Sequence, residues 1–173
     1  QFTVVIIKPG SVYGPGAITW CLRPLQAIQQ DRIALIDHGS GFFLHTYIEN
    51  LLDGLLSVLT ASHIDGEVIE ITDGDNTTTW KTYLNDLATL AGKPPITRNM
   101  TKTTASLISH IMMIRYNLFH KPPLLTPTAV HLFTNHRTVS IEKAHQLLRY
   151  SPVVDYTEGM KRTAKWLKKE QYI

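Results

Sequence analysis

The chain has 173 residues, a formal net charge of +3, 18% charged residues and 43% apolar residues. This composition is that of a globular chain of single-domain length and excludes a disordered one. The basic surplus is concentrated in the last predicted helix and is not interleaved with aromatic residues, so we expect no nucleic-acid partner.

The first predicted element is the apolar run VVII at 4–7. Such a run is typical of a parallel strand covered on both faces. Ligands in open α/β sheets bind just past the carboxyl ends of the strands, so residues 9–13 are expected at a ligand site. We expect the neighbouring strands to come from polypeptide preceding Gln1; without them the strand would be an exposed edge that pairs with a second copy.

The remaining elements follow from periodicity, caps and breakers. Thr79, Ser140 and Thr157 are predicted N-caps, and Pro24 is expected to kink the first helix. The helix at 49–61 places Leu52, Leu55, Leu56 and Leu59 on one stripe. Helices are predicted at 17–30, 49–61, 79–91, 104–119, 126–133, 140–148 and 157–171, and strands at 33–36, 42–47, 68–72 and 96–98.

Motifs for phosphate, metal or nucleophile chemistry are weak in this chain. Gly10, Gly14 and Gly16 do not have the G-x-G-x-x-G spacing of a dinucleotide loop. His131 and His136 are five residues apart, which is off the one-turn spacing of paired ligands, so no metal site is predicted. No nucleophile-elbow motif is present.

Four segments in order carry a family resemblance: KPGSVYGPG, DHGSGFFLHTYIENLLDG, GEVIEITDGDNTTTWKTYLNDL and VSIEKAHQLLRYSPVVDYTEGMKRTAKWL. Together they resemble the C-terminal half of an extended short-chain dehydrogenase/reductase, and most resemble its 3β-hydroxysteroid and sterol dehydrogenase branch. The resemblance implies an α/β fold, the C-terminal part of an extended Rossmann-type fold, with few short strands and a helix-rich substrate-binding lobe over residues 1–173. The N-terminal dinucleotide-binding half would be absent from this chain.

The resemblance also implies roles for individual residues. NAD or NADP would be bound mainly by the missing half, while backbone groups of Pro9, Gly10, Ser11 and Val12 would meet the nicotinamide. Tyr13, Phe43 and Tyr47 would contact substrate, although Tyr13 also suits a packing aromatic at a strand end.

Two departures from the family pattern bear on the catalytic residues and on the substrate class. No Tyr-x-x-x-Lys pair occurs, so no catalytic residue is expected in this chain. Phe43 stands where sugar-nucleotide enzymes of the superfamily commonly carry an arginine, and phenylalanine cannot pair with a diphosphate.

The predicted function is therefore the substrate-binding portion of an NAD(P)-dependent oxidoreductase acting on a secondary alcohol or ketone, 3β-hydroxysteroid dehydrogenase-like, and inactive as this chain alone. A nucleotide-sugar epimerase or dehydratase and a non-catalytic nucleotide-sensing or interaction module are the alternatives. The expected partners are a hydrophobic small-molecule substrate and a second copy of the chain in a homo-oligomer. The apolar helix at 104–119 suits peripheral membrane contact, or else core or dimer packing. The single cysteine, Cys21, fits a reducing, cytoplasmic location.

Overall fold

The computed structural model describes residues 4–120, 123 and 125–173 and has an α/β architecture. The chain divides into two compact units, each built from segments distant in sequence. The first unit comprises Gln1–Pro24, Leu44–Asn76 and Thr138–Ile173, and the second comprises Leu25–Phe43 and Thr77–Arg137.

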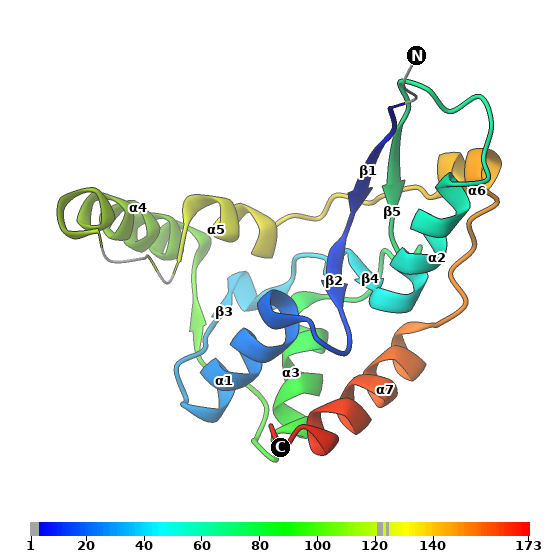
Figure 1. Ribbon diagram of the computed structural model, residues 1–173. Coiled ribbons are helices and arrows are strands. Elements are labelled where there is room, and N and C mark those ends of the chain that lie inside the picture. The colour runs from blue at the N-terminus through cyan, green and yellow to red at the C-terminus, as the bar shows by residue number, and fades with distance from the viewer. Residues whose placement is uncertain (1–3, 121–122, 124) are drawn as a thin grey trace. The chain divides into compact units, whose positions relative to one another are not determined.

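The first unit is built on parallel strand pairs. β1 pairs with β5 from Ile6↔Val68 to Pro9↔Ile71, and β2 pairs with β4 from Ser11↔His45 to Tyr13↔Tyr47. Figure 1 shows β1 and β2 end to end. The elements are β1 Ile6–Pro9, β2 Ser11–Tyr13, a π-helix Ile18–Leu22, β4 His45–Tyr47, α2 Ile48–Val58, β5 Val68–Ile71, α6 Glu142–Leu148 and α7 Tyr156–Lys169; α1 Arg23–Gln29 begins in this unit and continues into the second.

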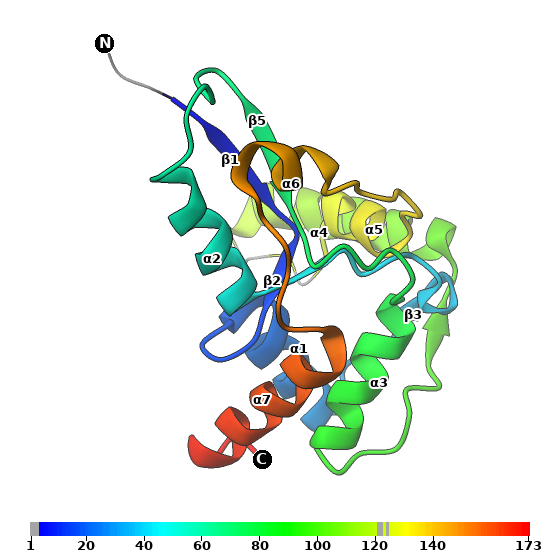
Figure 2. The same cartoon turned by 90° about the vertical axis from the view of Figure 1, so that its right-hand side faces the viewer.

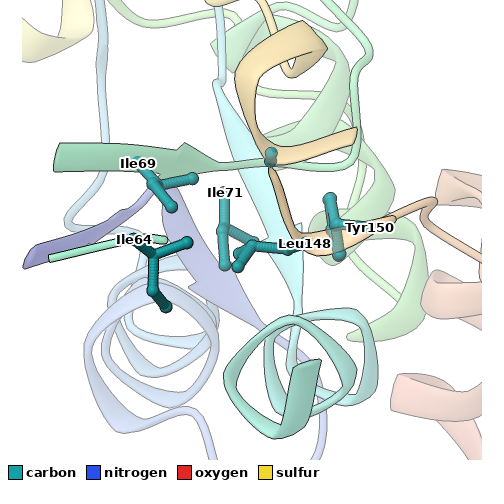
Figure 3. Packing of buried hydrophobic residues seen from close by; sticks show 6 residues of the cluster. Ile64, Ile69, Ile71, Leu148 and Tyr150 are labelled. Carbon is teal, nitrogen blue, oxygen red and sulfur yellow. The ribbon is translucent and has the colours of Figure 1, made fainter. Parts of the chain in front are cut away.

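The core of the first unit surrounds β5. Figure 2 shows α2 and α6 beside β1 and β5, and Figure 3 shows the side chains that fill this space. A Cβ atom added to Gly54 of α2 would lie 2.6 Å from Ile71 Cδ1, so the glycine permits the close approach of the helix to the strand. The buried cluster consists of Ile64, Ile69, Ile71, Ala144, Leu148 and Tyr150.

The expectation that the first strand is buried on both faces is wrong for this chain. Ile6 is 51% exposed, so the face of β1 on which it lies is not covered. Among the described residues β1 pairs with β5 along one edge only. The strand is instead the exposed edge expected when its neighbours are missing. It runs through Pro9, and the chain resumes at Ser11 as β2.

The second unit is mainly helical. Its β3 and β6 form one short parallel pair, Leu35↔Asn99 and Ile36↔Met100. Ile36, Ala105 and Val130 form a small buried cluster. The elements are β3 Leu35–Ile36, a 3₁₀ turn Asp37–Gly39, α3 Trp80–Leu90, β6 Asn99–Met100, α4 Lys102–Phe119 and α5 Pro127–Phe133.

The structure confirms the predicted N-cap at Thr79 and changes the other two predicted helix starts. The Thr79 hydroxyl accepts a hydrogen bond from the Thr82 amide, as predicted. The Thr157 prediction is wrong, because the Asp155 carboxylate caps α7 by accepting from the Glu158 amide at 2.8 Å. The Ser140 hydroxyl accepts from the Glu142 amide, although the N-cap position itself is Ile141.

Two further predictions have different outcomes. α4 begins two residues earlier than predicted, with Thr101 as its cap. The sequence also predicts that a Lys121-Pro122-Pro123 break ends this helix, and residues 121 and 122 lie outside the described residues. Within the described residues, no helix has the length and apolarity needed to cross a membrane.

Candidate functional site

The segment from Pro9 to Tyr13 is held rigidly at the carboxyl end of β1. The Gly10 amide donates to the Ile71 carbonyl and to the Thr46 hydroxyl, each at 3.0 Å, and the Ser11 amide donates to the Leu44 carbonyl at 2.7 Å. A Cβ at Gly10 would collide with the Leu44 carbonyl oxygen, so only glycine fits this approach. The backbone of this loop is therefore fixed before any ligand arrives.

Two of the predicted substrate residues lie together just beyond this loop. Tyr13 and Tyr47 are both fully buried, and their ring centroids are 5.4 Å apart in an edge-to-face arrangement. The Tyr156 ring lies 6.0 Å from Tyr13, and a Cβ on Gly159 would collide with the Tyr13 hydroxyl. The start of α7 thus closes over the two tyrosines.

The electrostatic surroundings keep both phenols neutral. Burial raises the pKa of Tyr13 well above its ordinary value, and the Asp73 carboxylate raises it further. Burial and Glu49 also raise the pKa of Tyr47, while Arg162 opposes them. A tyrosine that acts as a proton donor and acceptor near neutral pH needs a lowered pKa, so neither phenol suits that role.

A buried polar network supports the tyrosine pair. The His45 ring lies between two carboxylates, with Nδ1 2.7 Å from Asp73 Oδ2 and Nε2 3.2 Å from Asp75 Oδ2. Asp73 also accepts from the Tyr47 amide and from the Asn50 side-chain amide. An ionised carboxylate only accepts, so both histidine contacts are hydrogen bonds when each ring nitrogen carries a proton.

Asn50 fixes the loop that precedes α7. Its side-chain nitrogen donates to the Val154 carbonyl at 2.8 Å, and its oxygen accepts from the Val153 and Val154 amides. Because the same nitrogen donates to Asp73, one buried side chain couples α2, β5 and the start of α7. Glu49 instead lies at the surface and pairs with Arg162.

Phe43, the third predicted substrate residue, belongs to the second unit. It is fully buried, stacks on Tyr83 with 3.9 Å between ring centroids, and packs against Trp80 at 4.6 Å. Its ring neighbours Trp80 and Tyr83 are aromatic, and the phenyl ring of Phe43 carries no charge that would hold a phosphate.

Sequence reasoning missed His45, Asp73 and Asn50 as members of the site. Their hydrogen bonds join residues 23 to 30 positions apart, a separation that local pattern does not reveal.

A surface depression is a further candidate site, whereas the described residues contain no cluster that could hold a metal ion. A surface depression of about 340 Å³ is lined by residues 74, 76 and 138–142, none of which is a predicted site residue. Among residues 4–120, 123 and 125–173, no three or more His, Cys, Asp and Glu side chains are grouped so as to hold a metal ion.

Comparison with curated proteins gives consistent relatives, although no protein-family model matches the chain. It is 31% identical to the 3beta-hydroxysteroid-dehydrogenase/decarboxylase isoform 1 of Arabidopsis thaliana, over 91% of this chain and 38% of that protein. It is 24% identical to the decarboxylating sterol-4-alpha-carboxylate 3-dehydrogenase of Saccharomyces cerevisiae, over 96% of this chain and 50% of that protein. The chain therefore spans half or less of the length of these relatives.

Solved structures support the same fold. An epimerase from Methanothermobacter thermautotrophicus matches 99% of this chain and 45% of its own, with a TM-score of 0.72 and 18% identity. The UDP-glucuronic acid 4-epimerase of Bacillus cereus, in a complex with a fluorinated UDP-sugar and NAD, matches 98% of this chain and 46% of its own, with a TM-score of 0.67 and 21% identity. The predicted fold, the C-terminal part of an extended Rossmann type, is confirmed.

Proposed function

We propose that the chain is the C-terminal half of an extended short-chain dehydrogenase/reductase of the 3β-hydroxysteroid and sterol dehydrogenase branch, and that it forms the substrate-binding portion of an NAD(P)-dependent oxidoreductase. The reaction would interconvert a secondary alcohol and a ketone on a hydrophobic substrate. The observation that carries this proposal is the backbone of Gly10 and Ser11, which is locked at the carboxyl end of a parallel strand.

The residues of this loop fit a flat amide-bearing ring. The Gly10 and Ser11 amides are already bonded within the protein, so the nicotinamide carboxamide would be met by the remaining main-chain groups of Pro9, Gly10, Ser11 and Val12. Bound NAD or NADP supplies the hydride-accepting or hydride-donating carbon. This chain contributes orientation, because a loop that does not move presents one face of the ring to substrate.

Tyr13 and Tyr47 of the first unit would contact the substrate, and Phe43 of the second unit is the third proposed substrate residue. All three are buried aromatic residues, which suits an apolar substrate. Burial raises the pKa of both Tyr13 and Tyr47, which argues against either phenol as the acid or base of the reaction near neutral pH. The proton-transferring groups and most of the dinucleotide contacts would lie on the other half, so the chain alone would be inactive.

That other half would dock on the uncovered side of the first unit. Among the described residues β1 pairs only with β5, so its other edge is able to accept a further parallel strand. On α2 the stripe of Leu52, Leu55, Leu56 and Leu59 is exposed. An open strand edge beside an exposed leucine face is what a sheet shows when its next strand and helix are supplied by other polypeptide.

A nucleotide-sugar epimerase or dehydratase is the second candidate, favoured by the fold shared with the UDP-glucuronic acid 4-epimerase. Against it, Phe43 is enclosed by Tyr83 and Trp80, and a phenyl ring offers no charge to a diphosphate. The sterol-type substrate therefore remains our first choice.

Ligand-induced stabilisation separates the two candidates. We expect a 3β-hydroxy sterol, presented in detergent micelles, to raise the melting temperature of the chain, and UDP-glucuronic acid to leave it unchanged. The reverse result would make the nucleotide sugar the substrate class. Micromolar binding of NAD by the chain alone would contradict the assignment of most cofactor contacts to the other half.

Three further expectations belong to this proposal. Without the other half, the chain alone would self-associate through the β1 edge. It would reside in the reducing cytoplasm, where the buried Cys21 stays a thiol. The chain would also contact a membrane surface, and the exposed side of α4 is the candidate contact.

A further inference from the structure

A buried histidine of the first unit contacts two carboxylates of one loop. His45 of β4 is 1% exposed, and its Nδ1 and Nε2 atoms lie 2.7 Å from Asp73 Oδ2 and 3.2 Å from Asp75 Oδ2. Both acids belong to residues 73–76, which follow β5 and which we call the 73–76 loop. A single imidazole ring therefore holds two points of this loop.

The two carboxylates differ in their access to water. The Asp73 side chain is 2% exposed and also accepts from the Tyr47 amide and the Asn50 side chain. The Asp75 side chain is 28% exposed. If the histidine contact is lost, water can solvate Asp75 directly, whereas Asp73 would be left buried without one of its donors.

The number of protons on the ring decides whether both contacts are hydrogen bonds. An imidazolium donates from both nitrogens, whereas a neutral imidazole has one N–H group and one lone pair. Because Asp73 is the carboxylate without access to water, the single proton of a neutral ring would remain on Nδ1. The Nε2 lone pair would then face the Asp75 carboxylate, and the contact between these two acceptors would be repulsive.

The surroundings of the ring are compatible with a second ring proton. The two carboxylates balance the positive charge that this proton adds, as burial of an imidazolium requires. The rings of Tyr13 on β2 and Tyr156 on α7 lie 5.4 Å and 5.2 Å from the His45 ring between centroids. The titratable groups beside the ring therefore include Asp73, Asp75, Tyr13 and Tyr156, and the α7 cap Asp155 adds negative charge near Tyr13.

The 73–76 loop also holds the segment that precedes α6. The Asn76 side chain accepts from the Val139 amide at 2.8 Å and donates to the Val139 carbonyl at 3.1 Å. Gly74 and Asn76 line the surface depression together with residues 138–142. Because Asp75 lies between Gly74 and Asn76 in the chain, its displacement would disturb the bonds that shape this depression.

We propose that protonation of His45 controls the 73–76 loop. With both ring nitrogens protonated, His45 holds Asp75; when it loses one proton, Asp75 turns to solvent and the contact between Asn76 and Val139 weakens. The held form carries more protons, so it is favoured as the pH falls and is lost as the pH rises. The proposal does not rest on the dehydrogenase function, because it involves no ligand.

Hydrogen exchange of the Val139 amide in the 173-residue chain tests the proposal. Ring ¹⁵N NMR of His45 in the same samples would report its protonation from about pH 5 to about pH 9. We expect the Val139 protection factor, corrected for intrinsic exchange at each pH, to fall about three- to ten-fold as the ring loses its second proton. The Tyr47 amide, which is bonded to Asp73, should keep its protection factor.

Asp75→Asn separates this effect from a general effect of pH. The asparagine side chain can accept from a protonated Nε2 and donate to a deprotonated one, so Val139 should keep its protection over the whole pH range. His145→Gln is the matched control, because His145 is an exposed histidine on α6 of the same unit. It should show the same pH dependence as the unaltered chain, and circular dichroism should show both variants folded.

Three results would overturn the proposal. The Val139 protection factor would stay constant while the His45 ring loses its second proton, or the ring would hold the same number of protons from about pH 5 to about pH 9. Alternatively, Asp75→Asn would show the same pH-dependent loss of protection as the unaltered chain, which would place its cause outside the contact with His45.

Discussion

At the scale of single residues, Asp73 is the most heavily bonded charge of the candidate site. Its side chain is almost entirely buried and accepts from His45, the Tyr47 amide and Asn50. In Asp73→Asn an NH2 group replaces one carboxylate oxygen. This new donor would face at least one of the groups that now donate to Asp73. We expect a loss of about 2–3 kcal/mol in the free energy of unfolding, measured by denaturant titration.

Asp75→Asn is the control for that change. Asp75 is partly exposed, and its contact with His45 is longer, at 3.2 Å. Its replacement should cost less than about 1 kcal/mol. Equal losses at the two positions would mean that Asp73 does not organise the network.

Gly159 of α7 lies against Tyr13 and Tyr47, so replacing it tests whether the start of α7 packs on the two tyrosines. In an open helix Gly→Ala would stabilise by about 1 kcal/mol, but here the new methyl group would meet the Tyr13 hydroxyl and lie 3.0 Å from the Tyr47 ring. We expect Gly159→Ala to destabilise by about 1–3 kcal/mol. In a Tyr13→Phe background the cost should be smaller, and a double-mutant cycle that shows no coupling would refute the contact.

Buried phenols and the thiol predict alkaline sensitivity. Burial raises the pKa of Tyr13 and Tyr150 above the ordinary tyrosine value and raises that of Cys21 to about 12. A group whose pKa is raised in the folded state stabilises the protein fully only below its unfolded pKa, about 8.5 for cysteine and about 10 for tyrosine. The free energy of unfolding should therefore fall as the pH rises through this range.

Tyr150→Phe should make that alkaline decline shallower, because one of the responsible groups is removed. The hydrogen bond from its hydroxyl to the Thr72 carbonyl would also be lost, so stability at neutral pH should be slightly lower. An unchanged slope in alkaline denaturation curves would argue against the burial of this phenol.

At the scale of elements, α2 carries a face that this chain does not cover. Leu52 and Leu56 are exposed, whereas Leu51, on the same helix, packs against the core cluster around β5. We expect L52Q/L56Q to leave the free energy of unfolding within about 0.5 kcal/mol and to reduce self-association in light scattering. Leu51→Gln, the matched control, should destabilise the fold clearly.

Local pattern predicted most helices and strands but not every boundary. Thr79 caps α3 as expected because no other side chain competes for the Thr82 amide. Asp155, and not Thr157, caps α7, because the helix begins at Tyr156 and the Asp155 carboxylate accepts from the Glu158 amide. For α2 the leucine spacing correctly gave one stripe, but spacing does not say whether polypeptide covers it.

At the scale of the whole molecule, the end of the first strand was predictable and its long-range support was not. The sequence predicts a strand that ends at Pro9, and β1 ends there. That a ligand binds at residues 9–13, past the carboxyl end of this strand, stays a prediction. The assembly of each unit from distant segments depends on long-range contacts such as that between Asn50 and Val154, which no local pattern encodes. The exposed β1 edge likewise depends on which strands the chain contains.

The most direct test is a chimera in which the half of the yeast sterol-4-alpha-carboxylate 3-dehydrogenase that this chain does not match is joined to the N-terminal end of this chain. Formation of reduced nicotinamide would be followed with a 3β-hydroxy sterol and with UDP-glucuronic acid. We predict turnover of the sterol by the chimera, none by this chain alone, and none with the sugar nucleotide. Sugar-nucleotide turnover without sterol turnover, or sterol oxidation by this chain alone, would contradict the proposed function.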